Sequence, residues 1–222
     1  MKYEFHDSGH QTIATFDIET TSFDAKDGEV VAIGIATHSR EEPAANIEYQ
    51  CFYRTSSTDE TEIIHAAIDA LNEIDTTCLV SYNGIDFDLP FLQKRLELLD
   101  AESVPINLAE GDEHLDLFLP RKLRADARGD QWPGLEACLE SYEYTPAKTL
   151  WRGEEVNNTR FGEKLGPEYL SALAEENNDL AETLRETIEH YLITDLEANL
   201  TLYYSDIGVD FDPVYEAQSA SF

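Results

Sequence analysis

The chain has 222 residues, of which 42% are hydrophobic, and its 46 acidic against 15 basic side chains give a formal net charge of −31 at pH 7. This hydrophobic content, with 11 Tyr and 10 Phe, excludes a disordered chain and suffices for one folded α/β domain. No apolar run approaches the roughly 20 residues of a membrane-spanning helix, so we expect no membrane partner.

The acidic excess is the strongest compositional feature, and only six of the basic residues are Lys. A chain this negative should repel nucleic acid at ordinary salt. The Debye length falls to roughly 3 Å at 1 M salt, so concentrated salt screens that repulsion. The composition resembles that of proteins from extremely halophilic archaea, and we interpret the acidity as an adaptation to salt. The alternative is an acidic protein that binds cations or basic proteins.

The N-terminal residues, MKYEFHD, lack the hydrophobic core of a secretion signal. The three cysteines, Cys51, Cys78 and Cys138, are widely spaced and show no zinc-binding pattern. Buried free thiols are typical of a reducing compartment. We therefore expect a cytoplasmic protein.

The hydrophobic pattern predicts an α/β fold with a mixed sheet, in which three antiparallel strands precede parallel strands and helices flank the sheet. We expect one domain over residues 1–222, with a core at about 11–204 and a tail at 207–222 without clear periodicity. Apart from one helix, residues 119–160 read as irregular. In chain order the predicted elements are strands at 11–20, 30–38 and 47–54, a helix at 61–74, a strand at 77–82, a helix at 89–99, a strand at 114–118, and helices at 135–142, 167–175 and 180–204.

Two acids lie at the end of the first predicted strand, in the stretch TFDIET at 15–20. Side chains alternate along a strand, so Asp17 and Glu19 point to one face. Burying two neighbouring carboxylates is costly without a compensating cation, and no Arg or Lys lies within six residues of either acid. A divalent metal is one solution, and an exposed, solvated strand end is the other.

A third acid, Asp88, lies in the segment NGIDFDLP at 83–90, where a strand end is followed by a loop and a helix start. In α/β sheets, binding sites form beyond the carboxyl ends of strands, where Asp17 and Glu19 lie. For Asp88, position alone favours a helix N-cap, because Asp is a favoured cap and Pro90 fits just inside the helix, and a role in the site is the alternative. Asp86 is a weaker rival to Asp88.

The fourth acid, Asp195, interrupts an otherwise apolar or aromatic stripe on the last predicted helix. A buried Asp is rare without a partner or a metal, so a solvated surface position is the weaker interpretation. Tyr191 lies one turn earlier on the same face, and its hydroxyl could reach a water near Asp195. Core packing is the alternative role for Tyr191. The stripe consists of Leu184, Ile188, Tyr191, Asp195, Ala198 and Leu202.

Together these segments resemble the three motifs of the DEDD class of 3′-to-5′ exonucleases, which have an RNase H-like fold. FDIET matches the first motif, residues 83–90 match Asn-x-x-x-Phe-Asp-x-Pro, and residues 191–195 match the Tyr-x-x-x-Asp motif of the tyrosine subclass. The pattern is most similar to the proofreading domains of family B DNA polymerases and to related stand-alone predicted exonucleases. His190 also has the spacing of the histidine subclass and is therefore the rival to Tyr191. We favour Tyr191, because it lies on the apolar stripe of the helix.

This resemblance implies two divalent metal ions, Mg or Mn, that bridge a scissile phosphate. Two ions roughly 3.5–4 Å apart activate a water and stabilise the leaving oxygen. By the resemblance, Asp17 bridges both ions, Glu19 and Asp195 complete the nucleophile side, Asp88 serves the leaving-group side, and Tyr191 orients the attacking water.

The resemblance also implies a single-stranded nucleic acid with a free 3′ end as substrate, positioned by Asn83 and Phe87, and a polymerase or repair protein as partner. We expect DNA. An exoribonuclease with the same site stays the alternative, because no feature of the sequence reads a 2′-hydroxyl and so distinguishes RNA from DNA. No polymerase domain follows in this sequence, so we expect that the chain is not itself a replicative polymerase.

Four basic residues lie within eight positions and precede Trp132. Phosphate contacts and a stacking aromatic ring suit a single strand, so Arg121, Lys122 and Arg124 are candidates for substrate binding, together with Arg128. The alternative is an exposed basic loop that pairs with nearby acids.

Two functions compete with the nuclease. One is a non-catalytic RNase H-like module that binds nucleic acid or a polymerase, and the other is a cation-binding acidic protein. The presence of all four acids favours the enzyme, because a decayed site would usually lose at least one of them.

Overall fold

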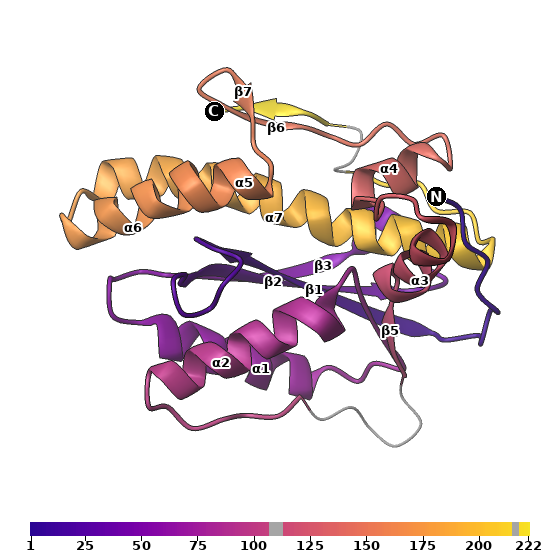
Figure 1. Ribbon diagram of the computed structural model, residues 1–222, viewed down its shortest axis with the longest axis horizontal. Coiled ribbons are helices and arrows are strands. Elements are labelled where there is room, and N and C mark those ends of the chain that lie inside the picture. The colour runs from indigo at the N-terminus through magenta and orange to yellow at the C-terminus, as the bar shows by residue number, and fades with distance from the viewer. Residues whose placement is uncertain (107–112, 215–217) are drawn as a thin grey trace.

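The computed structural model describes residues 1–106, 113–214 and 218–222. A five-stranded sheet with the order β3-β2-β1-β4-β5 lies at its centre (Figure 1). The first three strands are antiparallel, whereas β4 and β5 continue the sheet in parallel to β1, which confirms the predicted mixed α/β fold. The strands are β1 (Thr12–Thr20), β2 (Val30–Ser39), β3 (Glu48–Tyr53), β4 (Cys78–Ser81) and β5 (Glu113–Asp116).

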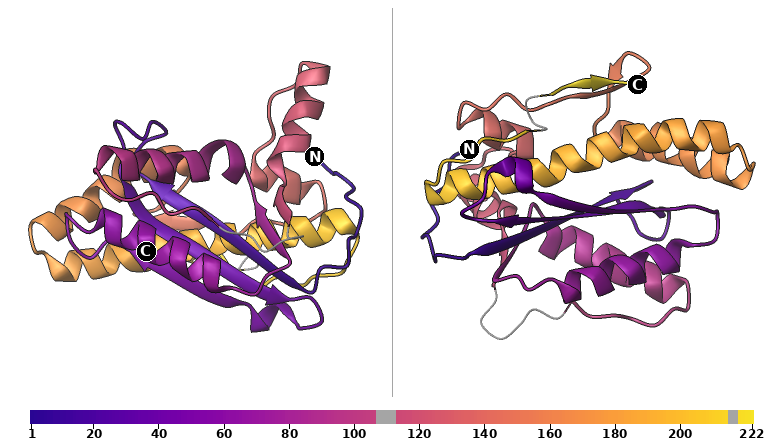
Figure 2. Two further views of the ribbon diagram at one scale, coloured as in Figure 1. Left: turned by 90° about the horizontal axis from the view of Figure 1, so that it is seen from below. Right: turned by 180° about the vertical axis from the view of Figure 1, so that it is seen from behind.

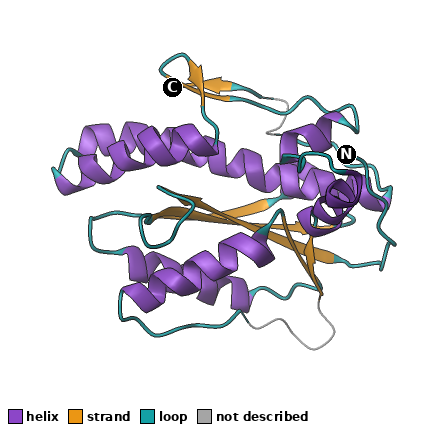
Figure 3. Cartoon of the chain, in the orientation of Figure 1, coloured by secondary structure: helices purple, strands orange, loops and turns teal. Residues whose placement is uncertain are grey.

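Helices cover both faces of this sheet (Figure 3). On one face lie α1 (Glu60–Glu73) and α2 (Leu89–Leu98), and on the other lies the 30-residue α7 (Asn178–Ile207). Phe16 and Ile18 of β1 pack into the apolar cluster with α1 and α2. Because side chains alternate along β1, Asp17 and Glu19 face α7.

A glycine lets α7 lie close to the sheet. Gly34 of β2 is paired with Asp17, and a Cβ atom on Gly34 would lie 2.7 Å from Cδ1 of Leu196 and 2.8 Å from Cγ of Leu192. The helix backbone can approach at this point because no side chain intervenes. This close approach holds the part of α7 that carries Asp195 against the carboxyl half of β1.

The segment predicted to be irregular contains a helix, α3 (Phe118–Arg128), so that prediction was wrong there. Figure 2 shows α3 projecting to one side of the sheet. The sequence of α3, FLPRKLRADAR, does not show a purely apolar helical stripe, because the buried face of the helix includes the charged Arg121. Arg121 is fully buried, and its Nη2 donates to both carboxylate oxygens of Asp206 on α7, at 2.6 and 2.8 Å. The predicted strand at 114–118 ends at Asp116, where α3 is about to begin.

A small second sheet lies on the far side of α7 from the main sheet (Figure 1). Its order is β7-β6-β8, and β8 brings the chain end beside β6 in parallel. The tail at 207–222 has no clear periodicity in the sequence, yet its last residues form β8; residues 215–217 lie outside the described residues. The sheet consists of β6 (Thr149–Trp151), β7 (Glu154–Glu155) and β8 (Ala220–Ser221).

The remaining elements are short. In the described part of the chain, no helix combines the length and apolar character needed to cross a membrane. These elements are η1 (Ala44–Asn46), η2 (Gly84–Asp88), α4 (Leu135–Glu140), α5 (Asn158–Arg160), η3 (Phe161–Leu165) and α6 (Gly166–Ala174).

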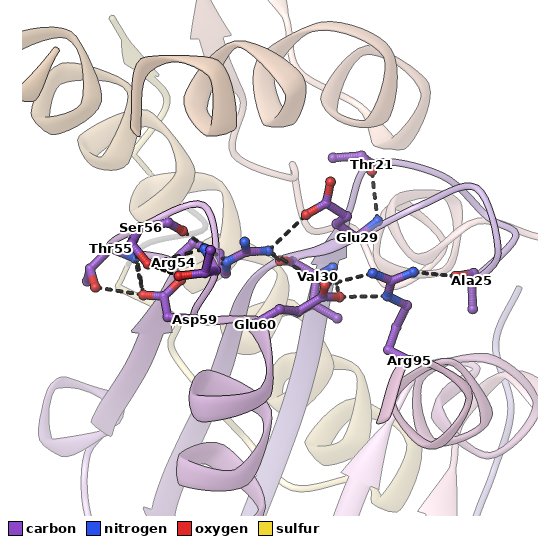
Figure 4. Close-up of polar contacts among 11 residues, drawn as sticks. Thr21, Ala25, Glu29, Val30, Arg54, Thr55, Ser56, Asp59, Glu60 and Arg95 are labelled. Carbon is purple, nitrogen blue, oxygen red and sulfur yellow. Dashed lines mark hydrogen bonds and ion pairs between the residues drawn. The ribbon is translucent and has the colours of Figure 1, made fainter. Parts of the chain in front are cut away.

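A buried ion-pair network anchors the loop between β1 and β2 (Figure 4). Glu60, at the start of α1, accepts hydrogen bonds from Nε and Nη2 of Arg95, both at 2.7 Å, and from the backbone N–H of Val30 at 2.8 Å. Arg95 also donates to the carbonyl of Ala25 at 2.8 Å, and Arg54 donates to Glu29 at 3.1 Å. The network therefore ties both helices to the loop that leaves the end of β1.

Candidate active site

Three of the predicted carboxylates form one cluster. Asp17 and Glu19 come from β1 and Asp195 from α7, and one carboxylate oxygen of each lies within 4.8 Å of the others. Glu19 is only 6% exposed, whereas Asp17 and Asp195 are half-buried. The cluster joins residues that are far apart in the sequence, because α7 crosses the sheet at the carboxyl end of β1.

Asp88 lies at the end of η2, a single wide helical turn after β4, and is 4% exposed. Its carboxylate makes no capping hydrogen bond at the start of α2, so the alternative role as a helix cap is not supported. Burial raises the pKa of Asp88 well above its usual range, and the negative charge of Asp17 raises it further. Asp88 is therefore electrostatically part of the carboxylate cluster.

Charge repulsion characterises the whole cluster. Burial raises the pKa of Glu19 well above its usual range, and the charges of Asp17, Asp195 and Asp88 add to the effect. Burial also raises the pKa of Asp17. The charges that act most strongly on Glu19 and Asp88 are those of other carboxylates, so the repulsion arises among the acids themselves.

The donor set suits a hard divalent cation. All four groups offer carboxylate oxygens, which are the ligands that Mg²⁺ and Mn²⁺ prefer, and the set contains neither thiolate nor imidazole. Such a cation would relieve the repulsion that raises these pKa values. The residues therefore fit a divalent metal centre.

A cavity of about 420 Å³ opens onto the four carboxylates. The expected substrate-positioning residues Asn83 and Phe87 line it, as do Tyr82 and Phe118. The structure thus brings the acids and these two residues to one hollow, with a volume in the range typical of small-ligand sites.

Tyr191 and His190 point to different neighbours. The buried Tyr191 donates its hydroxyl to Oδ1 of Asn158 at 2.7 Å, and Asn158 lines the cavity. Burial raises the pKa of Tyr191 well above its usual range, and Asp195 is the next largest cause. By contrast, the ring nitrogens of His190 lie 2.7 Å from Oγ1 of Thr149 and 3.1 Å from the carbonyl of Gln218. His190 therefore faces the small sheet, and Tyr191 faces the carboxylates.

Asp116 is a buried residue of the site that the sequence analysis missed. Its carboxylate accepts hydrogen bonds from the backbone N–H groups of Asn83 at 2.9 Å, Ile85 at 3.0 Å and Phe118 at 2.9 Å. Asn83 has a positive φ of 75°, a conformation that Asn adopts more readily than most residues. Asp116 thus clamps the loop that presents Asp88. Its position at the end of a predicted parallel strand was the available signal.

The basic residues of α3 have different surroundings. Arg121 is enclosed by the protein and paired with Asp206, so it is not available to a substrate, and its expected role is corrected. Nζ of Lys122 lies 2.9 Å from Oδ2 of Asp86, which places Asp86 in a surface ion pair. Arg124 donates to the carbonyl of Lys2 at 3.0 Å. Of the three candidates, Lys122 is the one beside the cavity wall, since its Nζ lies 5.8 Å from the ring of Phe118.

Comparison with known families identifies the class. Residues 14–158 match the model of the RNase H superfamily, and the chain therefore belongs to that superfamily. The matched region contains Asp17, Glu19 and Asp88 and ends before α7. This membership confirms the resemblance to an RNase H-like family.

Among curated proteins, the chain is similar to the DNA polymerases of Thermococcus aggregans and Thermococcus litoralis, each 26% identical over 221 residues. These matches cover 94% of this chain but only 11% and 12% of the polymerases, so this chain spans about a ninth of the length of each polymerase. Among solved structures, the family B DNA polymerase of Pyrobaculum calidifontis matches with a TM-score of 0.60 and 18% identity, over 88% of this chain and 24% of that one. That match shows a shared fold.

Proposed function

We propose that the protein is a divalent-metal-dependent 3′-to-5′ exonuclease that acts on single-stranded DNA. The observation that carries the proposal is the meeting of Asp17, Glu19, Asp88 and Asp195 at one cavity, where the carboxylates repel one another. The similarity to DNA polymerases supports DNA as the substrate. A polymerase or repair partner stays a prediction.

The four carboxylates would hold two Mg²⁺ or Mn²⁺ ions. When bound, these ions would polarise the scissile phosphate and lower the pKa of the attacking water. Asp17, whose charge acts on both Glu19 and Asp88, would help to hold both ions. Glu19 and Asp195 would help to hold the ion that activates the nucleophile, and Asp88 the ion that stabilises the leaving group. These acids supply the negative charge that makes the cavity selective for cations.

Other residues of the chain would orient the reactants. Tyr191 is held by Asn158 and by stacking on Phe161, with ring centroids 5.7 Å apart, so its hydroxyl is well placed to orient a water beside Asp195. Asn83 and Phe87 would receive the terminal nucleotide, the amide by hydrogen bonding and the ring by stacking. Asp116 would keep this loop in place through its three hydrogen bonds.

A nuclease assay tests the proposal. Single-stranded DNA and RNA of one sequence, labelled at the 5′ end, are incubated with the protein and Mg²⁺ or Mn²⁺ in concentrated KCl. Stepwise shortening of the 5′-labelled DNA is expected, because removal from the 3′ end leaves the label on a ladder of products. Asp17→Asn and Asp195→Asn should reduce cleavage to background, since each removes a charge from the cluster.

Glu186→Gln is the matched control, because Glu186 is an exposed acid on the same helix as Asp195. It should keep full activity. Activity retained by Asp17→Asn would refute the assignment of the site. RNA shortened in place of DNA would identify an exoribonuclease. Binding of the strand without cleavage would identify a non-catalytic module, and metal binding without either would identify a cation-binding protein.

A further inference from the structure

A row of aromatic rings leads from the cavity to the surface. Tyr82 and Phe118 line the cavity, and their ring centroids are 5.2 Å apart. The ring of Trp132 meets that of Phe118 edge-on, with centroids 6.0 Å apart. Trp132 is 56% exposed. The row therefore begins at the candidate active site and ends on an open indole.

Trp132 is held in place although most of its surface is exposed. Its Nε1 donates to Oδ1 of Asp126 at 2.7 Å. The neighbouring carbonyl of Pro133 accepts a hydrogen bond from the hydroxyl of Tyr82 at 2.6 Å, which fixes the loop to the end of β4. Because more than half of the indole is exposed, its burial contributes little hydrophobic stabilisation to the folded protein. A fixed and open aromatic face beside a cavity is the geometry of a stacking platform.

A lysine lies against this ring. Nζ of Lys122 lies 4.8 Å from the ring centroid of Trp132, and Arg128 is exposed at the end of the same helix. Acids lie here as well: Asp86 pairs with Lys122, Asp126 holds the indole, and the exposed Asp130 lies two residues before Trp132. In a chain with a net charge of −31, a lysine between two aromatic rings is a local departure from the general charge.

We propose that Trp132 stacks on a base of the single-stranded substrate, upstream of the nucleotide in the cavity, with Lys122 contacting the adjoining phosphate. This rests on the proposed function, because the strand must end in the cavity. Stacking is tolerant of sequence, and it persists at high salt, where phosphate contacts weaken. A negative chain that works in concentrated salt would therefore depend on the aromatic ring more than on the lysine. A single strand suits this patch better than a protein does, because bases and phosphates alternate as the rings and the cation do.

Two substrates of different length test the platform. The first is thymidine 5′-monophosphate p-nitrophenyl ester, which is too short to extend from the cavity to Trp132, and the second is a single-stranded oligonucleotide of about eight residues. The quantity compared is the ratio of kcat/KM for the oligonucleotide to kcat/KM for the ester. In Trp132→Ala this ratio should fall roughly tenfold, mainly because KM for the oligonucleotide rises. Trp132→Phe keeps an aromatic ring and should recover most of the ratio. Leu123→Ala, at a 70% exposed apolar residue of α3 beside Lys122, is the control and should keep the wild-type ratio.

Binding provides a readout that does not require catalysis. The anisotropy of a labelled oligonucleotide, measured in chelator, should show weaker binding for Trp132→Ala at both low and high KCl, and for Lys122→Ala mainly at low KCl. An unchanged ratio and unchanged binding in Trp132→Ala would overturn the platform, as would an equal loss with both substrates. If the wild type binds the strand through Trp132 but cleaves neither substrate, the platform stands and the proposed exonuclease fails.

Discussion

At the scale of single residues, Asp195 shows how much a local pattern can predict. Its place in an apolar stripe predicted an inward-facing acid, and in the structure it joins Asp17 and Glu19. Tyr191 and His190 are adjacent, and sequence spacing alone admits either. Neighbouring helix residues point about 100° apart, so the contacts of each ring distinguish them.

Separate substitutions of Tyr191 and His190 test which of them serves the site. Tyr191→Phe should lower kcat on the order of 10- to 100-fold, because it removes the hydroxyl and keeps the ring stacked on Phe161. His190→Ala should instead lower the melting temperature, because His190 contacts Thr149 and Gln218, and leave kcat near the wild-type value. Steady-state kinetics and thermal unfolding measure both. The opposite result, with kcat lost in His190→Ala alone, would place the protein in the histidine subclass.

At the scale of elements, the crossing of α7 over the sheet assembles the site. The helix supplies Asp195, and β1 supplies the acids opposite it. Gly34 is the contact that sets their separation, because Leu192 and Leu196 pack directly on its backbone. Arg121 and Asp206 fix the last turn of the same helix to α3.

Gly34→Ala tests the role of this crossing. The added methyl would overlap both leucines, so we expect a loss of about 1–3 kcal/mol in the free energy of unfolding. Nuclease activity should also fall, because α7 must move away from β1. Urea unfolding and the nuclease assay measure the two effects. The double variant Gly34→Ala/Leu192→Ala should be less destabilised than the sum of the single variants, because the smaller side chain returns space. Strict additivity would contradict this account.

At the scale of the whole molecule, the dominant feature is the large negative net charge. A net charge of −31 destabilises a compact chain through self-repulsion, and the carboxylate cluster adds a local contribution at its centre. Several arginines are taken up in internal pairs, as in the contacts of Arg54, Arg95 and Arg121 with Glu and Asp side chains. The surface is therefore left strongly acidic.

Salt titration tests whether this acidity is an adaptation. The melting temperature should rise steeply with KCl up to about 1 M, where the Debye length is roughly 3 Å, because screening removes the repulsion. A further rise above that concentration would indicate that the acidic surface also favours the folded state through hydration. Sucrose at equal osmolality is the control, since it does not screen charge. Full stability at low ionic strength would contradict the halophilic interpretation.

The sequence by itself determined the central sheet, the helices that cover it and the residues of the acidic cluster. Periodicity is local, so apolar alternation and the 3.6-residue stripe are readable along the chain. Tertiary structure alone decided the helix at Phe118–Arg128, whose buried Arg121 is compensated by Asp206, 85 residues away. It also decided the clamp made by Asp116 and the outward position of Trp132. A charge or a ring takes its role from partners that only folding brings near, and no local pattern carries that information.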